Sequence, residues 1–394
     1  MEAVIRPRVA DQAGFSLIEL LVAMALTVMI MSATLAGLSD IMKSNQLVLD
    51  TAQMNNHLRT GADLMIRDFL QAGSGLPSSK TVMIPFGTGS SQVRLPGPLQ
   101  PTPSSPATWL APVGTQSISA VLPRPGAGPV INGTNTDVVT VLMADNTFVD
   151  VRLSAVTNTT ATVCGPADTT TCTGWPFTPA ATHPDRVARG QLMMLSKGSV
   201  NTLVQVTDVN QTTRVINFDN GDSLNLNQSA AIEGSLRNLN GEDPVDDAST
   251  TGVNEAAQAT RISRMRMITY YLDTTNPTRP RLMRRVNNGH WQTFNNNLGT
   301  AVATDVYDLQ FTYDISNGAP PPTGNPGGVE MTAADLGGSG RCSPNPCATT
   351  QIRKINLRLT TRTMNQVSGQ NRFMSNTLDS QVSLRAMAFV DRYR

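Results

Sequence analysis

The chain has 394 residues and a formal net charge of +1 at pH 7. Without a basic stripe or an acidic arm, the sequence gives no sign of a nucleic-acid partner or a charged disordered tail. The length allows one large or two ordinary domains, and the many Thr, Asn, Gly and Pro residues indicate a β-rich protein with long turns outside the cytoplasm.

The first predicted element is a helix that crosses a membrane. Residues 1–14 are short, polar and mixed in charge. No charged residue occurs from Leu20 to Leu38, and this run is long enough to span a bilayer core as a helix. It exceeds the apolar region of a secretory signal, and no A-x-A site follows it. The sequence therefore predicts a retained transmembrane segment at about 20–38.

The helical pattern continues beyond Asp40 with one apolar face. Its members recur at spacings of three or four: Leu47, Thr51, Met54, Leu58, Ala62, Met65, Phe69 and Ala72. No proline interrupts it, and Gly73 and Gly75 give a stop signal. One helix from Phe15 to about Ala72 is roughly 85 Å long at 1.5 Å per residue. Its amphipathic part requires a partner surface, and we expect the downstream domain to supply it.

The remainder, 76–394, is predicted to be one β-rich globular domain. Residues 76–135 and 317–350 are rich in Pro, Gly and Ser and predict long loops, with a strand or two in the first. Alternating or β-branched runs predict strands at 137–144, 147–153, 191–196, 203–209, 264–272, 281–286, 308–315, 352–361 and 379–390. The predicted fold class is α+β, in which the long helix packs on an antiparallel sheet.

Four cysteines form two close pairs, Cys164 with Cys172 and Cys342 with Cys347. Four cysteines allow three disulfide patterns. We expect the local one, because each pair then closes a short loop, as suits an oxidising compartment. The alternative is a zinc site, but "CSPNPC" has two prolines between its cysteines and no histidine nearby. We therefore expect no bound metal.

The stretch "GFSLIELLVAMAL" (14–26) resembles the N-terminal signal of type IV pilins and of the pseudopilins of type II secretion. The resemblance implies that a prepilin peptidase cleaves after Gly14 and methylates the new N-terminus at Phe15. It also implies that Glu19 pairs with the α-amine of a neighbouring subunit, because either charge alone would be costly in an apolar filament core. The chain departs from the family in its leader, where the nearest basic residue before Gly14 is Arg8.

Downstream segments resemble PilW-like minor pilins and GspJ-like pseudopilins. Examples are "LMIRDFLQAGSG" (64–75), "VYDLQFTYDI" (306–315) and "SQVSLRA" (380–386). This resemblance implies a minor pilin at the pilus tip that helps to initiate assembly and presents an adhesin. Its partners would be other minor pilins, the major pilin, the prepilin peptidase and the adhesin. It would lie in the inner membrane as a prepilin with a periplasmic domain, and then in the pilus on the cell surface.

Two other interpretations stay open. One is a minor pseudopilin of a type II secretion system, which would share the N-terminal chemistry. The other is a periplasmic enzyme or binding module that uses the helix only as a tether, and such a protein has no need of Glu19. The sequence holds no H-E-x-x-H, G-x-S-x-G or P-loop pattern. We therefore expect neither an enzyme nor a cofactor.

Three further groups have both a structural and a functional interpretation. The first consists of aromatic residues that form core packing or a binding surface: Tyr270, Tyr271, Tyr307, Tyr313 and Trp291. The second consists of arginines on a solvated face or an acidic-partner surface: Arg261, Arg264, Arg266, Arg279, Arg281, Arg284 and Arg285. The third consists of Asp- and Asn-rich loops at 218–225 and 238–247, which ordinary turns or calcium would explain.

Overall fold

The structure is a computed structural model. It describes residues 14, 16–85, 87, 91–97, 116–148, 151–163, 187–198, 200–210, 213–228, 234–236, 260–287, 299–315, 349–367 and 372–388. One long N-terminal helix is followed by a β-rich domain in which every strand pair of the described residues is antiparallel. The predicted α+β class is therefore confirmed.

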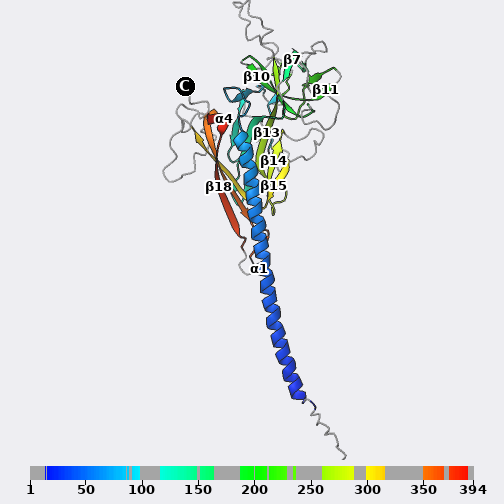
Figure 1. Cartoon of the computed structure of the whole chain (residues 1–394), viewed down its shortest axis with the longest axis vertical. Coiled ribbons are helices and arrows are strands. Elements are labelled where there is room, and N and C mark those ends of the chain that lie inside the picture. The colour runs from blue at the N-terminus through cyan, green and yellow to red at the C-terminus, as the bar shows by residue number, and fades with distance from the viewer. Residues whose placement is uncertain are drawn as a thin grey trace, which may run out of the picture.

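The helix α1 runs without interruption from Leu17 to Gln71. Figure 1 shows that its N-terminal half projects away from the domain, whereas its C-terminal half lies against the strands. The buried positions recur every three or four residues and lie in the C-terminal half: Met54, Leu58, Gly61, Ala62, Met65, Asp68 and Phe69. The amphipathic stripe therefore packs on the domain, as the sequence predicts.

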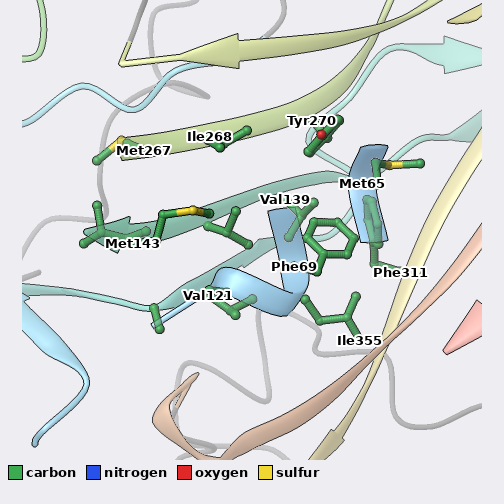
Figure 2. Close-up of a cluster of buried hydrophobic side chains, with 14 of the residues drawn as sticks. Met65, Phe69, Val121, Val139, Met143, Met267, Ile268, Tyr270, Phe311 and Ile355 are labelled. Carbon is green, nitrogen blue, oxygen red and sulfur yellow. The ribbon is translucent and has the colours of Figure 1, made fainter. Parts of the chain in front are cut away.

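Phe69 is the centre of the contact between helix and domain. Its ring meets those of Tyr270 and Phe311 edge to face, with centroids 5.8 and 5.9 Å apart, an arrangement that aromatic pairs favour. Figure 2 shows Phe69 and Met65 surrounded by apolar side chains from several strands, among them Ile355. All five side chains are buried, so α1 forms part of the main core rather than a surface attachment.

Two glycines end the helix. Gly73 and Gly75 have φ angles of 79° and 67°, in the left-handed region that favours glycine. The Gly73 N–H donates to the Leu142 carbonyl oxygen at 2.9 Å, which ties the end of the helix to a strand. The stop signal expected at these glycines is thus confirmed.

The strands form two main sheets. The larger has eleven strands: β3 (Val121–Arg124), β6 (Val138–Ala144), β7 (Val151–Val156), β8 (Thr160–Val163), β9 (Leu192–Lys197), β10 (Val200–Gln205), β11 (Asp208–Asn210), β12 (Val215–Asn217), β13 (Arg261–Asp273), β14 (Arg281–Val286) and β15 (Thr300–Thr304). The smaller has the order β16 (Val306–Ile315), β17 (Ile352–Arg362) and β18 (Ser375–Ser383).

Short elements complete the described part. They are the pair β1 (Thr81–Met83) and β2 (Ser117–Ser119), the pair β4 (Val130–Ile131) and β5 (Thr134–Asn135), the 3₁₀ turn η5 (Thr349–Gln351) and the short helix α4 (Arg385–Ala388). Only Asp305, with φ of 59°, separates β15 from β16, so the two main sheets join at this residue. The helix α1 contacts strands of both sheets.

Gly61 marks the closest approach of the helix to the two sheets. A Cβ atom at this position would lie 3.0 Å from Leu282 on β14, 3.3 Å from Ala303 on β15 and 3.7 Å from Leu359 on β17. A larger residue would force the helix away from these side chains. Gly61 therefore permits α1 to contact both sheets at one level.

The strand predictions at 137–144, 191–196, 264–272, 281–286, 308–315 and 352–361 match β6, β9, β13, β14, β16 and β17. Three others differ. The run at 147–153 starts later, as β7, and that at 203–209 is divided between β10 and β11. The run at 379–390 covers the end of β18 and then α4, where Leu384 and Met387 are buried at helical rather than strand spacing.

Candidate assembly site along the N-terminal helix

A capping box begins α1. The Ser16 backbone N–H donates to the Glu19 carboxylate at 3.0 Å, and the Glu19 N–H donates to the Ser16 hydroxyl oxygen at 3.2 Å. Ser16 has the extended backbone of an N-cap, with φ of −72° and ψ of 147°. These two bonds satisfy donors that a helix N-terminus leaves free. Glu19 therefore has a partner within its own chain.

Gly14 lies two residues before this N-cap and is exposed. A Cβ atom built on it would meet no other atom within 4 Å, and Gly14 is not among the glycines with positive φ. Among the described residues, none therefore crowds this position. Phe15 lies outside the described residues.

The projecting half of α1 is apolar and exposed. Large side chains along it have more than half of their surface exposed, from Leu17 at 80% to Leu49 at 62%. In the described part of the chain, α1 is the one helix long and apolar enough to cross a membrane by length and composition. Such a surface is costly in water, so this half is suited to lipid or to packing against other apolar helices.

A buried polar cluster fixes the other half of the helix to the larger sheet. Asp68 on α1 accepts two hydrogen bonds from the Arg284 guanidinium, at 2.7 and 3.2 Å, and one from the Tyr270 hydroxyl at 2.6 Å. Asp68 and Arg284 side chains are 10% and 23% exposed. Because a buried charge is stable only when it is paired, this cluster specifies how α1 lies on the domain.

Electrostatics follow from this geometry. Burial opposes the charged form of Arg284, but the hydrogen bond and the charge of Asp68 outweigh it and raise the pKa of the guanidinium. Burial, with the adjacent Asp68 carboxylate, raises the pKa of Tyr270. At neutral pH the cluster therefore holds a charged Arg284 and a neutral, proton-donating Tyr270.

The tyrosine prediction is confirmed for packing. Tyr270, Tyr271, Tyr307 and Tyr313 are all buried, with exposed fractions of 9% or less. They do not form a surface. Trp291, the fifth residue of that group, lies outside the described residues, as do Cys164, Cys172, Cys342 and Cys347.

The solvated-face prediction for the arginines is wrong for Arg264, whereas the side chains of Arg266, Arg279 and Arg281 are paired and still 39–44% exposed. Arg264 is 6% exposed and bonds to Asp145 at 2.8 Å. The other ion pairs of the group are Arg266 with Asp145, Arg279 with Asp305, Arg281 with Asp273 and Arg284 with Asp68. The pairs of Arg264 with Asp145 and of Arg284 with Asp68 join segments more than a hundred residues apart, which a one-dimensional pattern of charge does not show.

The Asp-rich loop at 218–225 is organised by its own backbone. Asp222 accepts hydrogen bonds from the N–H groups of Leu224, Leu226 and Asn227 at 2.8–3.2 Å, and burial raises its pKa. A hollow of about 350 Å³ lies beside it. Within the described ranges, no group of three or more His, Cys, Asp or Glu residues is placed to hold a metal ion. The loop at 238–247 lies outside the described residues.

The sequence analysis missed two features of this site. The capping box is visible as S-x-x-E at Ser16 and Glu19 and was available as a signal. The Asp68 cluster could not be recognised from the sequence, although an acidic residue next to the apolar stripe is unusual. Its partners Tyr270 and Arg284 lie on strands more than two hundred residues away.

The comparisons with known proteins agree with the N-terminal motif. Residues 10–35 match the family model described as the prokaryotic N-terminal methylation motif. This match, together with the apolar helix that follows, supports a type IV pilin-like or pseudopilin protein and is consistent with membrane anchoring. No curated protein and no solved structure matches the chain.

Proposed function

We propose that this protein is a minor pilin of a type IV pilus. It is made as an inner-membrane prepilin with a periplasmic domain, cleaved after Gly14, methylated at Phe15 and incorporated at or near the pilus tip. There it helps to initiate assembly with other minor pilins and the major pilin, and it presents an adhesin. The observation that carries the proposal is the methylation motif at residues 10–35, placed at the start of a helix with an exposed apolar half.

The two halves of α1 support this proposal together. The exposed half offers an apolar surface from Leu17 to Leu49, suited first to the bilayer and then to neighbouring helices. The docked half is held by a large core and by the Asp68 cluster. Moving the helix from membrane to filament would therefore carry the whole domain with it. A simple tether requires only the first half.

Chain size supports the minor class of pilin. With 394 residues, the chain is more than twice as long as the usual major pilin. Every copy of a major pilin must fit among its neighbours, whereas a subunit at the tip has few. A minor pseudopilin of a type II secretion system shares the motif and is the second candidate.

The capping box favours a competing explanation of Glu19. A carboxylate that caps its own helix has a purpose in a plain tether as well. In a filament, the same carboxylate would also meet the α-amine of a neighbouring Phe15. The two roles differ in what they require, because capping uses an acceptor oxygen and pairing with the amine uses a negative charge.

A pair of variants separates these roles. Glu19→Gln keeps a capping acceptor and removes the charge, whereas Glu19→Ala removes both. We expect both variants to remain in the membrane and to be lost from sheared filaments, because the charge is required for assembly. If Glu19→Gln enters filaments like the parent protein while Glu19→Ala does not, Glu19 serves only as a cap. If both variants function like the parent protein, the tether interpretation holds.

A further inference from the structure

The strand β18 forms one edge of the smaller sheet and pairs only with β17 among the described residues. Two backbone hydrogen bonds just beyond its ends show which residues of β18 face β17. The Thr363 N–H donates to the Met374 oxygen and the Leu384 N–H donates to the Arg353 oxygen, both at 2.8 Å. Antiparallel ladders alternate between bonded and non-bonded pairs. The backbone groups that point away from β17 therefore belong to Ser375, Thr377, Asp379, Gln381 and Ser383.

The opposite edge of the same sheet is covered by the chain itself. Asp137 donates its N–H to the Leu309 oxygen at 2.9 Å and accepts the Phe311 N–H on its carboxylate at 2.8 Å. The register of β16 also shifts at both of its ends, and such bulges discourage further pairing. Among the described residues, the β16 edge is thus covered and the β18 edge is not.

Among the described residues, β18 has few of the devices that block an exposed edge. Its sequence, SNTLDSQVS, contains no proline and no lysine, and its register with β17 is regular over nine residues. Its one charged side chain, Asp379, is bound to Arg358 of the adjacent strand at 2.9 Å. Natural proteins usually protect an edge of this length, so an unprotected one indicates a use.

A groove of about 430 Å³ runs between this edge and α1. Its walls come from both elements: Asn55, Leu58, Arg59, Asn376, Thr377, Leu378 and Asp379. Figure 1 shows β18 along the outer side of the domain beside α1, and the Asn376 amide bonds to Asn55 at 2.8 Å. A strand added to β18 would direct every second side chain into this groove.

The groove is lined by two charged side chains, Arg59 and Asp379, and Asp379 is already paired with Arg358 at 2.9 Å. Arg59 is exposed, and in the described part of the chain no carboxylate lies within ion-pair distance of it. An incoming strand with an Asp or Glu toward the groove would pair with it. The edge requires an extended backbone, and the half-buried Leu378 offers apolar contact beside the arginine.

We propose that β18 accepts an extended segment of a neighbouring pilin subunit, which adds as a further strand and places an acidic side chain over Arg59. This is β-strand addition, in which main-chain bonds supply affinity and alternate side chains supply specificity. The proposal rests on the proposed function, because it takes the partner to be another subunit of the filament. It adds a second contact to the one made by the helices.

Proline substitution tests the backbone contact. Thr377→Pro removes an N–H that points away from β17, so the existing ladder stays intact, and edge strands accept proline at such positions. Thr377→Ala keeps the N–H and is the matched control. We expect the proline variant to fall roughly tenfold or more in the filament fraction, which corresponds to about 1.4 kcal/mol, while the alanine variant does not change. Equal incorporation of both variants would overturn the proposal.

Two measurements keep the test independent of folding. Arg59→Glu changes only an exposed side chain and should reduce incorporation, whereas Arg59→Lys should not. In the unmodified protein, amide exchange at Thr377 and Gln381 should be fast in detergent and slow in filaments, while Leu378 stays protected in both. Fast exchange at Thr377 and Gln381 in filaments would refute strand addition and leave the proposed function standing. Absence of the parent protein from filaments would instead overturn the proposed function and the partner with it.

Discussion

Removing the Asp68 carboxylate is expected to destabilise the contact between helix and domain strongly. Asp68→Ala leaves the Arg284 guanidinium without the two bonds that it donates, and the Tyr270 hydroxyl without its acceptor. Both partners remain buried or largely buried. The variant therefore loses a contact and also leaves a charged group and a hydroxyl without partners.

The magnitude follows from the burial. Removing one partner of a buried ion pair costs about 3–5 kcal/mol, and a buried hydroxyl without a partner costs about 1–3 kcal/mol. Arg284 keeps some access to water, with 23% of its side chain exposed, so the lower part of the first range applies. We expect Asp68→Ala to lower the free energy of unfolding of the domain by about 4 kcal/mol.

Urea unfolding of the full chain in detergent micelles, followed by the circular dichroism of the β-strands, measures this loss. Asp63→Ala is the matched control, because Asp63 is an exposed carboxylate on the same helix, and its change should be within about 0.5 kcal/mol. The double variant Asp68→Leu with Arg284→Met removes both charges. It should recover much of the stability, because an apolar pair can replace a buried ion pair.

Two results would refute this reasoning. A loss below about 1 kcal/mol for Asp68→Ala would place the cluster in the range of exposed ion pairs. A double variant as unstable as Asp68→Ala would show that the cost is unrelated to an unpaired guanidinium.

Two further predictions concern packing and pH. Gly61→Leu should destabilise the domain by about 1–3 kcal/mol, because a Cβ atom there would already lie 3.0 Å from Leu282. Gly37→Leu is the control and should not destabilise it, because a Cβ atom at Gly37 meets nothing within 4 Å. Unchanged urea midpoints for both variants would contradict the close approach at Gly61. Burial raises the pKa of Asp145, but hydrogen bonds from Thr147 and the charges of Arg264 and Arg266 outweigh it and lower the pKa below 3.8. The Asp145 carboxylate therefore stabilises the fold fully above pH 3.8 and loses this effect as the pH falls through its lowered pKa. The loss of unfolding free energy caused by Asp145→Asn should thus be smaller at acidic pH than at neutral pH. A loss that is constant or larger in acid would contradict the lowered pKa.

The helix could be predicted from the sequence because its signals are local. The charge-free run, the apolar stripe and Gly73 with Gly75 each act within a few residues, and α1 extends from Leu17 to Gln71 as these signals indicate. The strands with clear alternation, such as β17, were equally accessible. The stretch after Ser383 was not, because burial of Leu384 and Met387 suits a strand or a helical turn until the packing is known.

The contacts between distant segments could not be predicted. The partners of Asp68 come from β13 and β14. This stretch is rich in arginine and tyrosine, and no local pattern distinguishes the two partners from the other residues of the same type. The exposed edge of β18 depends on the order of strands in a sheet, which local patterns do not determine. The N-terminal end of the candidate site could be predicted from the sequence. The role given to Phe15 stays a prediction.

The most direct test of the central claim is mass spectrometry of the protein recovered from sheared surface filaments. A mature N-terminus at N-methylated Phe15 in that fraction is the predicted result, since it joins processing and pilus incorporation in one molecule. The processed form found in membranes and absent from filaments would contradict the pilus and favour a pseudopilin. A chain that retains Gly14 and the residues before it would contradict the pilin account as a whole.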